Sequence, residues 1–279
     1  MTAAPSLAPG EMAEKAAQIG IRKTNWSVGQ LFVLSFLAGM YIAFGAIFAT
    51  LVSTGAAGVF PFGVTKLLAG LVFTVGLILV VVGGAELFAG SILMVMAYAN
   101  RQISLGGLLR NWAWVYFGNL VGSVSTALLV FLSGHYLFNN GNVGLNMLSI
   151  AEAKTGLPFL QATALGVLCN ILVSLAVWLT YSAQTVGGKI LAIIPPIAAF
   201  VAAGFEHSVA NMYFIPMGLM VKYGADGHFW ELIQKSAADF PHLTVTGFIL
   251  HNLIPVTIGN ILGGMLIGLA YWWVYLHHK

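Results

Sequence analysis

A glutamate and a histidine lie next to each other in the middle of a long apolar stretch. Glu206 and His207 follow Gly204, and hydrocarbon side chains dominate residues 191–203 and 209–221. Ionisable side chains at membrane depth are costly, and they usually mark a transport path or a proton relay. A histidine can give a proton to a passing weak-acid anion, or donate a hydrogen bond while it stays neutral. His207 is therefore the first candidate for a functional group, although a neutral core histidine bound to a backbone carbonyl is the alternative.

A second glutamate lies at a matching point earlier in the chain. The pattern Gly-x-Glu occurs at 84–86 and again at 204–206, and each copy interrupts an apolar run. Helices that break at corresponding points of two halves are typical of inverted-repeat transporters and channels with a site at the midplane. Glu86 and Glu206 could exchange protons. Their duplication favours a structural role, in which each carboxylate accepts hydrogen bonds from backbone N–H groups at its break.

The composition indicates an integral membrane protein. Of the 279 residues, 59% are hydrophobic and only 7% are charged, whereas a soluble domain carries about 25% charged residues. The net charge of +3 is small and the basic residues are scattered, so nucleic acid is not an expected partner. The single cysteine, Cys169, excludes an internal disulfide framework and is expected to be an inert buried thiol.

Six apolar segments are long enough to cross a membrane as helices. We expect an all-α membrane protein whose channel domain covers 28–276, with an inverted 3+3 repeat of spans over 28–135 and 158–276. Residues 1–27 are expected to be cytoplasmic and to contain an amphipathic helix at the membrane surface, and polar loops are expected at 133–157 and 222–243. The expected spans are 28–53, 63–100 with a break at 83–84, 105–132, 158–183, 189–221 with a break at 204–207, and 244–275.

Paired asparagines support the repeat. Asn111 and Asn119 are eight residues apart, as are Asn252 and Asn260, and both pairs include the pattern Gly-Asn-(Leu/Ile)-x-Gly. These amides are expected to bond between helices. Three spans is an odd number, so the two copies must insert with opposite orientation. Seven of the eleven lysines and arginines then fall on the side of the two termini, which predicts that both termini are cytoplasmic.

The helices that resume after the breaks are expected to point their N-termini at the centre. Each N-terminus contributes about half a positive charge and free N–H donors, which favours an anion. Asn170 could orient His207 or contact the substrate, or it could bond across helices. Lys154 could draw anions into a vestibule, or it could be a solvated loop lysine. Five apolar side chains flank the breaks and could form constrictions that exclude hydrated ions: Phe73, Leu77, Leu87, Phe88 and Phe200.

Several long motifs resemble the formate–nitrite transporter family, with the formate channel branch nearest. The resemblance covers residues 10–275. The motifs are PFGVTKLLAG (61–70), GAELFAG (84–90), NWAWVYFGNLVGS (111–123), GFEHSVANM (204–212) and NLIPVTIGN (252–260).

This resemblance implies an aquaporin-like protomer of six spans, a homopentamer with one pore in each protomer, and passage of small monovalent anions such as formate, nitrite or hydrosulfide. It implies that His207 is the central histidine, Asn170 its neighbour and Lys154 the vestibule lysine. Residues 83–90, which include Gly83 and Gly84, match a mobile loop. The formate channels usually carry a threonine where this chain has Ala89, so a hydroxyl contact to the anion or to the histidine is absent here.

The sequence thus predicts a passive or proton-coupled channel in a bacterial inner membrane, with formate as the first choice of substrate. A channel of the same fold for nitrite or hydrosulfide is one alternative. An aquaporin-type facilitator for neutral solutes is another, but it should carry two Asn-Pro-Ala motifs, and this sequence has none. An intramembrane enzyme using Glu206 and His207 is disfavoured because HExxH and Gly-x-Ser-x-Gly motifs and clustered metal ligands are missing. No cofactor or metal is expected.

Overall fold

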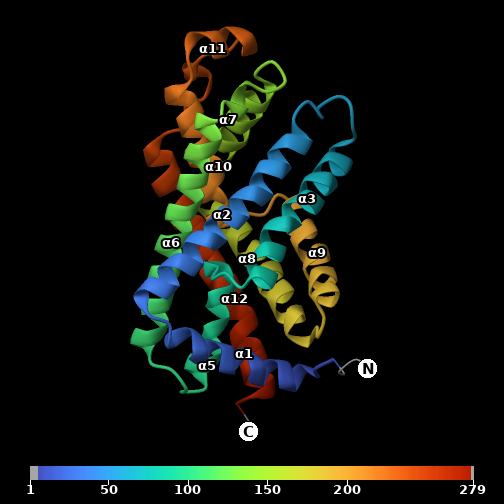
Figure 1. The fold of residues 1–279 in the computed structure, drawn as a ribbon, viewed down its shortest axis with the longest axis vertical. Helices are drawn as coiled ribbons and strands as arrows, with labels where there is room; N and C mark the ends of the chain where they lie inside the picture. Colours follow the sequence, from blue (N-terminus) through green and yellow to red (C-terminus); the bar gives the residue numbers. More distant parts are fainter. Residues whose placement is uncertain (1–5, 278–279) are drawn as a thin grey trace.

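The computed structural model describes residues 6–277, and every regular element within them is helical (Figure 1). Five helical segments are long and apolar enough to cross a membrane. The sixth span is divided into α9 (Val186–Ala202) and α10 (Ser208–Gly224), each 17 residues long. The five long segments are α2 (Val28–Ser53), α3 (Phe62–Gly83), α6 (Leu105–Leu132), α8 (Phe159–Ser182) and the final span Gly247–Tyr275.

Both predicted helix breaks are present. Gly84 follows α3 with a φ of +82°, and Gly204 lies two residues after α9 with a φ of +74°. Glycine adopts this left-handed conformation without the steric cost that a side chain adds. The helix resumes at Phe88 after the first break and at Ser208 after the second. The segment after the first break consists of three short elements: α4 (Phe88–Ser91), η1 (Ile92–Met94) and α5 (Val95–Ala99).

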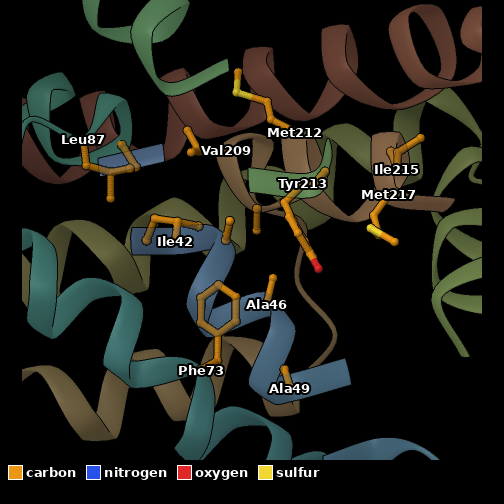
Figure 2. Packing of buried hydrophobic residues seen from close by; sticks show 14 of the residues in the cluster. Ile42, Ala46, Ala49, Phe73, Leu87, Val209, Met212, Tyr213, Ile215 and Met217 are labelled. Atoms are coloured by element: carbon orange, nitrogen blue, oxygen red, sulfur yellow. The ribbon is translucent and has the colours of Figure 1, made fainter. Parts of the chain in front are cut away.

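The helix contacts follow the inverted repeat. In the first half α2 packs against α6 and α3, and in the second half α8 packs against α12 (Ile254–Tyr275) and α9. The halves meet where α3 packs along α9. Figure 2 shows part of the buried core, in which Ile42, Ala46, Phe73 and Tyr213 belong to one cluster. The predicted fold of six spans with two broken helices is therefore confirmed.

The N-terminal amphipathic helix lies against protein. The helix α1 (Pro9–Thr24) buries Met12, Ala13, Ala16 and Ala17. These residues form a cluster with Met96, Ala97, Trp178 and Leu276, which come from both halves of the chain. The ends of the spans thus cover its apolar face, and its place at the membrane surface stays a prediction. α1, α5 and the end of α12 share one end of the molecule, so the two chain ends lie on the same side (Figure 1).

The predicted loop at 133–157 is wrong over most of its length. It contains η2 (His135–Leu137) and α7 (Asn142–Thr155), a helix that packs against α10. Val143, Met147 and Ala151 recur at intervals of four residues and are buried on one face. The glycines and asparagines just before this helix obscured that spacing in the sequence.

Residues 222–243 also contain helix. Asp226 caps α11 (Gly227–Ile233) by accepting the Phe229 N–H at 3.0 Å, and the Phe229 ring is fully buried. The final span begins as a π-helix before α12 continues it. The remaining elements are η3 (Ala237–Asp239) and the π-helix η4 (Gly247–Leu253).

Close helix contacts in both halves depend on glycine, which leads to a first prediction. A methyl group at Gly122 of α6 would overlap the Phe36 carbonyl oxygen of α2. Since backbone cannot move aside without separating the helices, Gly122→Ala should lower the free energy of unfolding by about 1–3 kcal/mol. Thermal unfolding in detergent would measure this. Gly187→Ala is the matched control, because nothing lies within 4 Å of the added methyl group. Equal melting temperatures for the two variants would contradict the prediction.

Candidate functional site

His207 caps the helix that follows the second break. Its Nδ1 accepts the Ala210 backbone N–H at 3.1 Å, and the ring is 3% exposed. A neutral imidazole whose Nδ1 is an acceptor carries its proton on Nε2. Among residues 6–277, this Nε2–H has no hydrogen-bond partner. The ring therefore offers one buried N–H donor at the point where the membrane helix is interrupted.

One aromatic ring adjoins the histidine, and a second adjoins the first. The Phe200 ring stacks on His207 with 6.0 Å between ring centroids. The Phe73 ring meets Phe200 edge-on at 5.7 Å, and both phenylalanines are 3% exposed. Two of the five predicted constriction residues thus come together beside the histidine. Phe88 does not, because its ring packs against Tyr116 at 4.9 Å and Trp112 of α6 at 6.2 Å.

A cavity of about 420 Å³ lies beside the first break, on the side of α1. Leu77 and Leu87, both nearly fully buried, belong to its wall, so the other two predicted constriction residues line this space. Gly84 and Glu86 of the break also line it. The remaining wall comes from α1 and the residues after it, α3, the break, α4 and α8: Ile19, Arg22, Lys23, Trp26, Val80, Val81, Ala85, Gly90, Val177, Thr180 and Tyr181.

The two glutamates bind lysines. Glu86 lies 2.7 Å from Lys23 of α1, and Glu206 lies 2.7 Å from Lys154 of α7. Side-chain amides complete the second cluster, since Asn211 donates to Glu206 at 2.7 Å and Asn252 donates to it at 3.2 Å. Burying a carboxylate is costly unless a cation and hydrogen-bond donors accompany it. Each glutamate thus fixes an amphipathic helix to its break.

The backbone at each break is held by an asparagine. The Asn119 amide accepts the Phe88 N–H at 2.9 Å and donates to the Glu86 carbonyl at 3.0 Å. In the second half, Asn260 accepts the Ser208 N–H and donates to the Glu206 carbonyl at the same two distances. The prediction assigned this role to the glutamate carboxylates. Their side chains instead bind lysine and polar side chains, and the asparagines bind the backbone.

The asparagines also correct the electrostatic expectation at the breaks. The N–H groups of Phe88, Ser208 and Ala210 are not free, because Asn119, Asn260 and the His207 ring accept them. Three of the N–H donors that the prediction invoked are therefore taken up within the protein, and the helix dipole and the Nε2–H donor still favour an anion.

Comparison with known proteins agrees with this geometry. Residues 10–273 match the family described as Formate/nitrite transporter. The chain is 46% identical over 274 residues to the formate channel FocA of Escherichia coli (strain K12), covering 98% of this chain and 96% of that protein. It is 41% identical over 259 residues to the formate channel FocA of Haemophilus influenzae, covering 93% and 91%. The chain belongs to the formate/nitrite transporter family. A solved structure described as a pentameric formate channel with formate bound superposes with a TM-score of 0.85 at 46% identity, covering 89% of this chain and 98% of that one.

In this member of the family, Asn170 lies between the helix that resumes after the first break and Asn260, the asparagine that holds the second break. Its amide donates to the Asn260 carbonyl at 2.6 Å and lies 3.5 Å from the Ala89 carbonyl. Of the roles predicted for Asn170, the bonds present in residues 6–277 are those between helices, and no bond joins it to His207. Its Oδ1 atom is buried without a partner.

The predicted mobile loop is tied at several points in this conformation. The Gly84 and Ala85 N–H groups donate to the Val80 carbonyl, and the Glu86 N–H donates to the Leu34 carbonyl at 3.1 Å. Gly83 ends α3, and Ala89 is fully buried in α4. Movement of residues 83–90 stays a prediction.

The sequence reading missed Lys23, although a signal for it exists. The dipeptide Lys-Thr occurs at 23–24 and again at 154–155, each time at the end of an amphipathic helix that precedes a span. The backbone carbonyls of Lys23 and Lys154 also accept from matching asparagines, Asn111 at 3.4 Å and Asn252 at 2.9 Å. The repeat therefore includes α1 and α7.

Among the described residues, no group of three histidine, cysteine or acidic side chains could hold a metal, and Cys169 is buried.

The lysine–glutamate pair predicts an asymmetric pattern of stability. Lys154→Met should destabilise the protein by about 3–5 kcal/mol, because it leaves the Glu206 carboxylate buried without a cation. Adding Glu206→Gln should recover much of this loss, since a glutamine oxygen still accepts from Asn211 and Asn252 without a charge. Melting temperatures of the two variants in detergent would test the pattern. A double variant less stable than Lys154→Met would contradict it.

Proposed function

We propose that this chain is a channel for small monovalent anions, with formate as its principal substrate, in the inner membrane of a bacterium. The observation that carries the proposal is the buried His207 ring, whose Nε2–H is aimed at no protein group and lies beside two aromatic rings at a helix break. The names of the relatives support formate as substrate. Assembly as a pentamer is proposed from the solved structure of similar fold.

The proposed path runs through the protomer along the two breaks. Phe73 and Phe200 form an apolar constriction on one side of His207, and Leu77 and Leu87 form another next to the α1 cavity. Such constrictions exclude ions that keep their hydration shell. An anion without that shell faces a cost of tens of kcal/mol by an idealised Born estimate. The α10 dipole and the Nε2–H of His207 lower this cost at the centre.

The histidine acts in this proposal as a hydrogen-bond donor. A neutral imidazole must gain a proton on Nδ1 before it can serve as a strong acid. In this site that proton would displace the Ala210 N–H, so protonation would cost the helix its cap. The proton that accompanies a weak acid would then come from water in the path.

The charged residues near the breaks are assigned a supporting role. Glu86 with Lys23 and Glu206 with Lys154 fix the amphipathic helices, and Asn170 lies between α4 and Asn260. We propose that both termini lie in the cytoplasm, since six of the ten lysines and arginines among residues 6–277 belong to the side of α1 in the proposed topology.

Formate flux should depend on the His207 donor. His207→Phe keeps a ring on Phe200 but has no N–H, and His207→Ser keeps a helix cap but is short. Losing a hydrogen bond to a charged group costs about 1.5–3 kcal/mol, so flux should fall about ten- to hundredfold in both variants. Uptake of labelled formate by proteoliposomes would measure this. Unchanged flux between acid and neutral pH would exclude the role, provided that both variants elute and melt like the parent protein.

The substrate class is tested with a series of solutes. Vesicles that contain the protein should take up formate well above empty vesicles, and they should take up glycerol no faster than empty vesicles. Nitrite and hydrosulfide, tested at two pH values, separate the formate channel from a family member with another preference. Glycerol uptake without formate uptake would overturn the proposed function.

A further inference from the structure

The helix α1 forms one wall of the cavity at the first break. Arg22 and Lys23, in its last turn, both line this space. Leu77 and Leu87, the proposed constriction next to this cavity, also line it. An anion that approaches the constriction from the side of α1 therefore passes both cations.

The two cations are in different electrostatic states. Lys23 is 2.7 Å from Glu86, so its charge is balanced by the one carboxylate that lines the cavity in the described part of the chain. Arg22 is exposed, and among residues 6–277 its guanidinium has neither a carboxylate nor a hydrogen-bond partner. The cavity consequently holds one positive charge without compensation.

The corresponding helix of the second repeat, α7, lacks that charge. The repeat pairs Lys23 with Lys154, since each ends an amphipathic helix, is followed by threonine and binds the glutamate of its break. The residue before Lys154 is Ala153, which is exposed, where the first copy has Arg22. At the position before the lysine, the twofold relation between the repeats is thus broken by one positive charge.

We propose that Arg22 recruits anions into the α1 cavity and gives the two mouths different apparent affinities for formate. This rests on the proposed function as an anion channel. A cation at the mouth of a cleft raises the local anion concentration. At roughly 5–10 Å in water, one unit charge changes that concentration about two- to fourfold.

The asymmetry between the two sides concerns the half-saturating concentration of formate and leaves the permeability equal. A passive pore must have the same permeability in both directions at low substrate concentration, because net flux vanishes at equilibrium. The charge therefore shows in the half-saturating concentration measured from each side. Formate supplied from the α1 side should saturate transport at a lower concentration than formate supplied from the α7 side.

The test uses the full chain in proteoliposomes of known orientation. Initial formate flux is measured against concentration from each side, at about 10 mM and about 1 M ionic strength, where the Debye lengths are about 30 Å and 3 Å. The variants are Arg22→Gln, Arg22→Lys and Ala153→Arg. Arg101→Gln is the matched control, since Arg101 is an exposed cation at the same end that does not line the cavity.

Arg22→Gln should raise the half-saturating concentration from the α1 side about two- to fourfold at low salt, with little change at high salt. Arg22→Lys and Arg101→Gln should match the parent protein, and Ala153→Arg should lower the value from the α7 side. An Arg22→Gln effect that is absent, equal to that of Arg101→Gln, or independent of salt would overturn the proposal. Formate flux that persists in such a result would leave the proposed function intact, whereas a parent protein without formate flux would remove both.

Discussion

Two asparagine side chains satisfy the backbone where membrane helices are interrupted, and the rest of the architecture depends on this. Hydrocarbon offers no hydrogen-bond partners, so irregular backbone at that depth persists only where protein or water satisfies it. Asn119 and Asn260 each bind the first N–H of the resumed helix and the carbonyl of the preceding glutamate. They also donate to carbonyls of α2 and α8, at Ser35 and Gly166, so each break is fixed to its own half. Among the described residues, the histidine ring at the second break therefore binds the backbone through the cap of α10 alone.

Charge is handled separately from the backbone. The carboxylates at the breaks point away from the loop and bind lysines of the amphipathic helices, so the charges sit at 2.7 Å from their partners. A membrane protein of this kind thus needs α1 and α7 as counter-ion carriers, and the repeated unit has four helical elements. Within the described residues, the site around His207 then holds no unbalanced ionic charge. An anion would bind there weakly enough to leave again, as conduction requires.

Features that are exceptional in an apolar sequence could be predicted from the sequence. The two breaks and the repeated asparagines were evident because polar and ionisable side chains such as glutamate and asparagine are rare and costly at membrane depth, and the six spans were evident from the apolar runs around them. The helix α7, the partner of Glu86 and the packing of Phe88 against α6 were not evident. They depend on which surfaces meet in three dimensions, and a phenylalanine beside a break is chemically the same whether it lines a path or packs on Tyr116. The choice between carboxylate and asparagine as the backbone clamp also needed geometry, since both can accept an N–H.

The docking of α1 has a consequence for biogenesis. Its apolar face packs against Trp178 of α8 and against Leu276, which directly follows α12. Because α1 precedes α8 and α12 in the chain, its apolar face can be fully covered only after α12 has been synthesised. Until then Met12 and its neighbours are uncovered at the membrane interface, and Lys23 can bind Glu86 only after the second span has inserted. Folding of the protomer therefore ends when α1 packs against the ends of the spans. A nascent chain that stops before the sixth span leaves the apolar face of α1 uncovered.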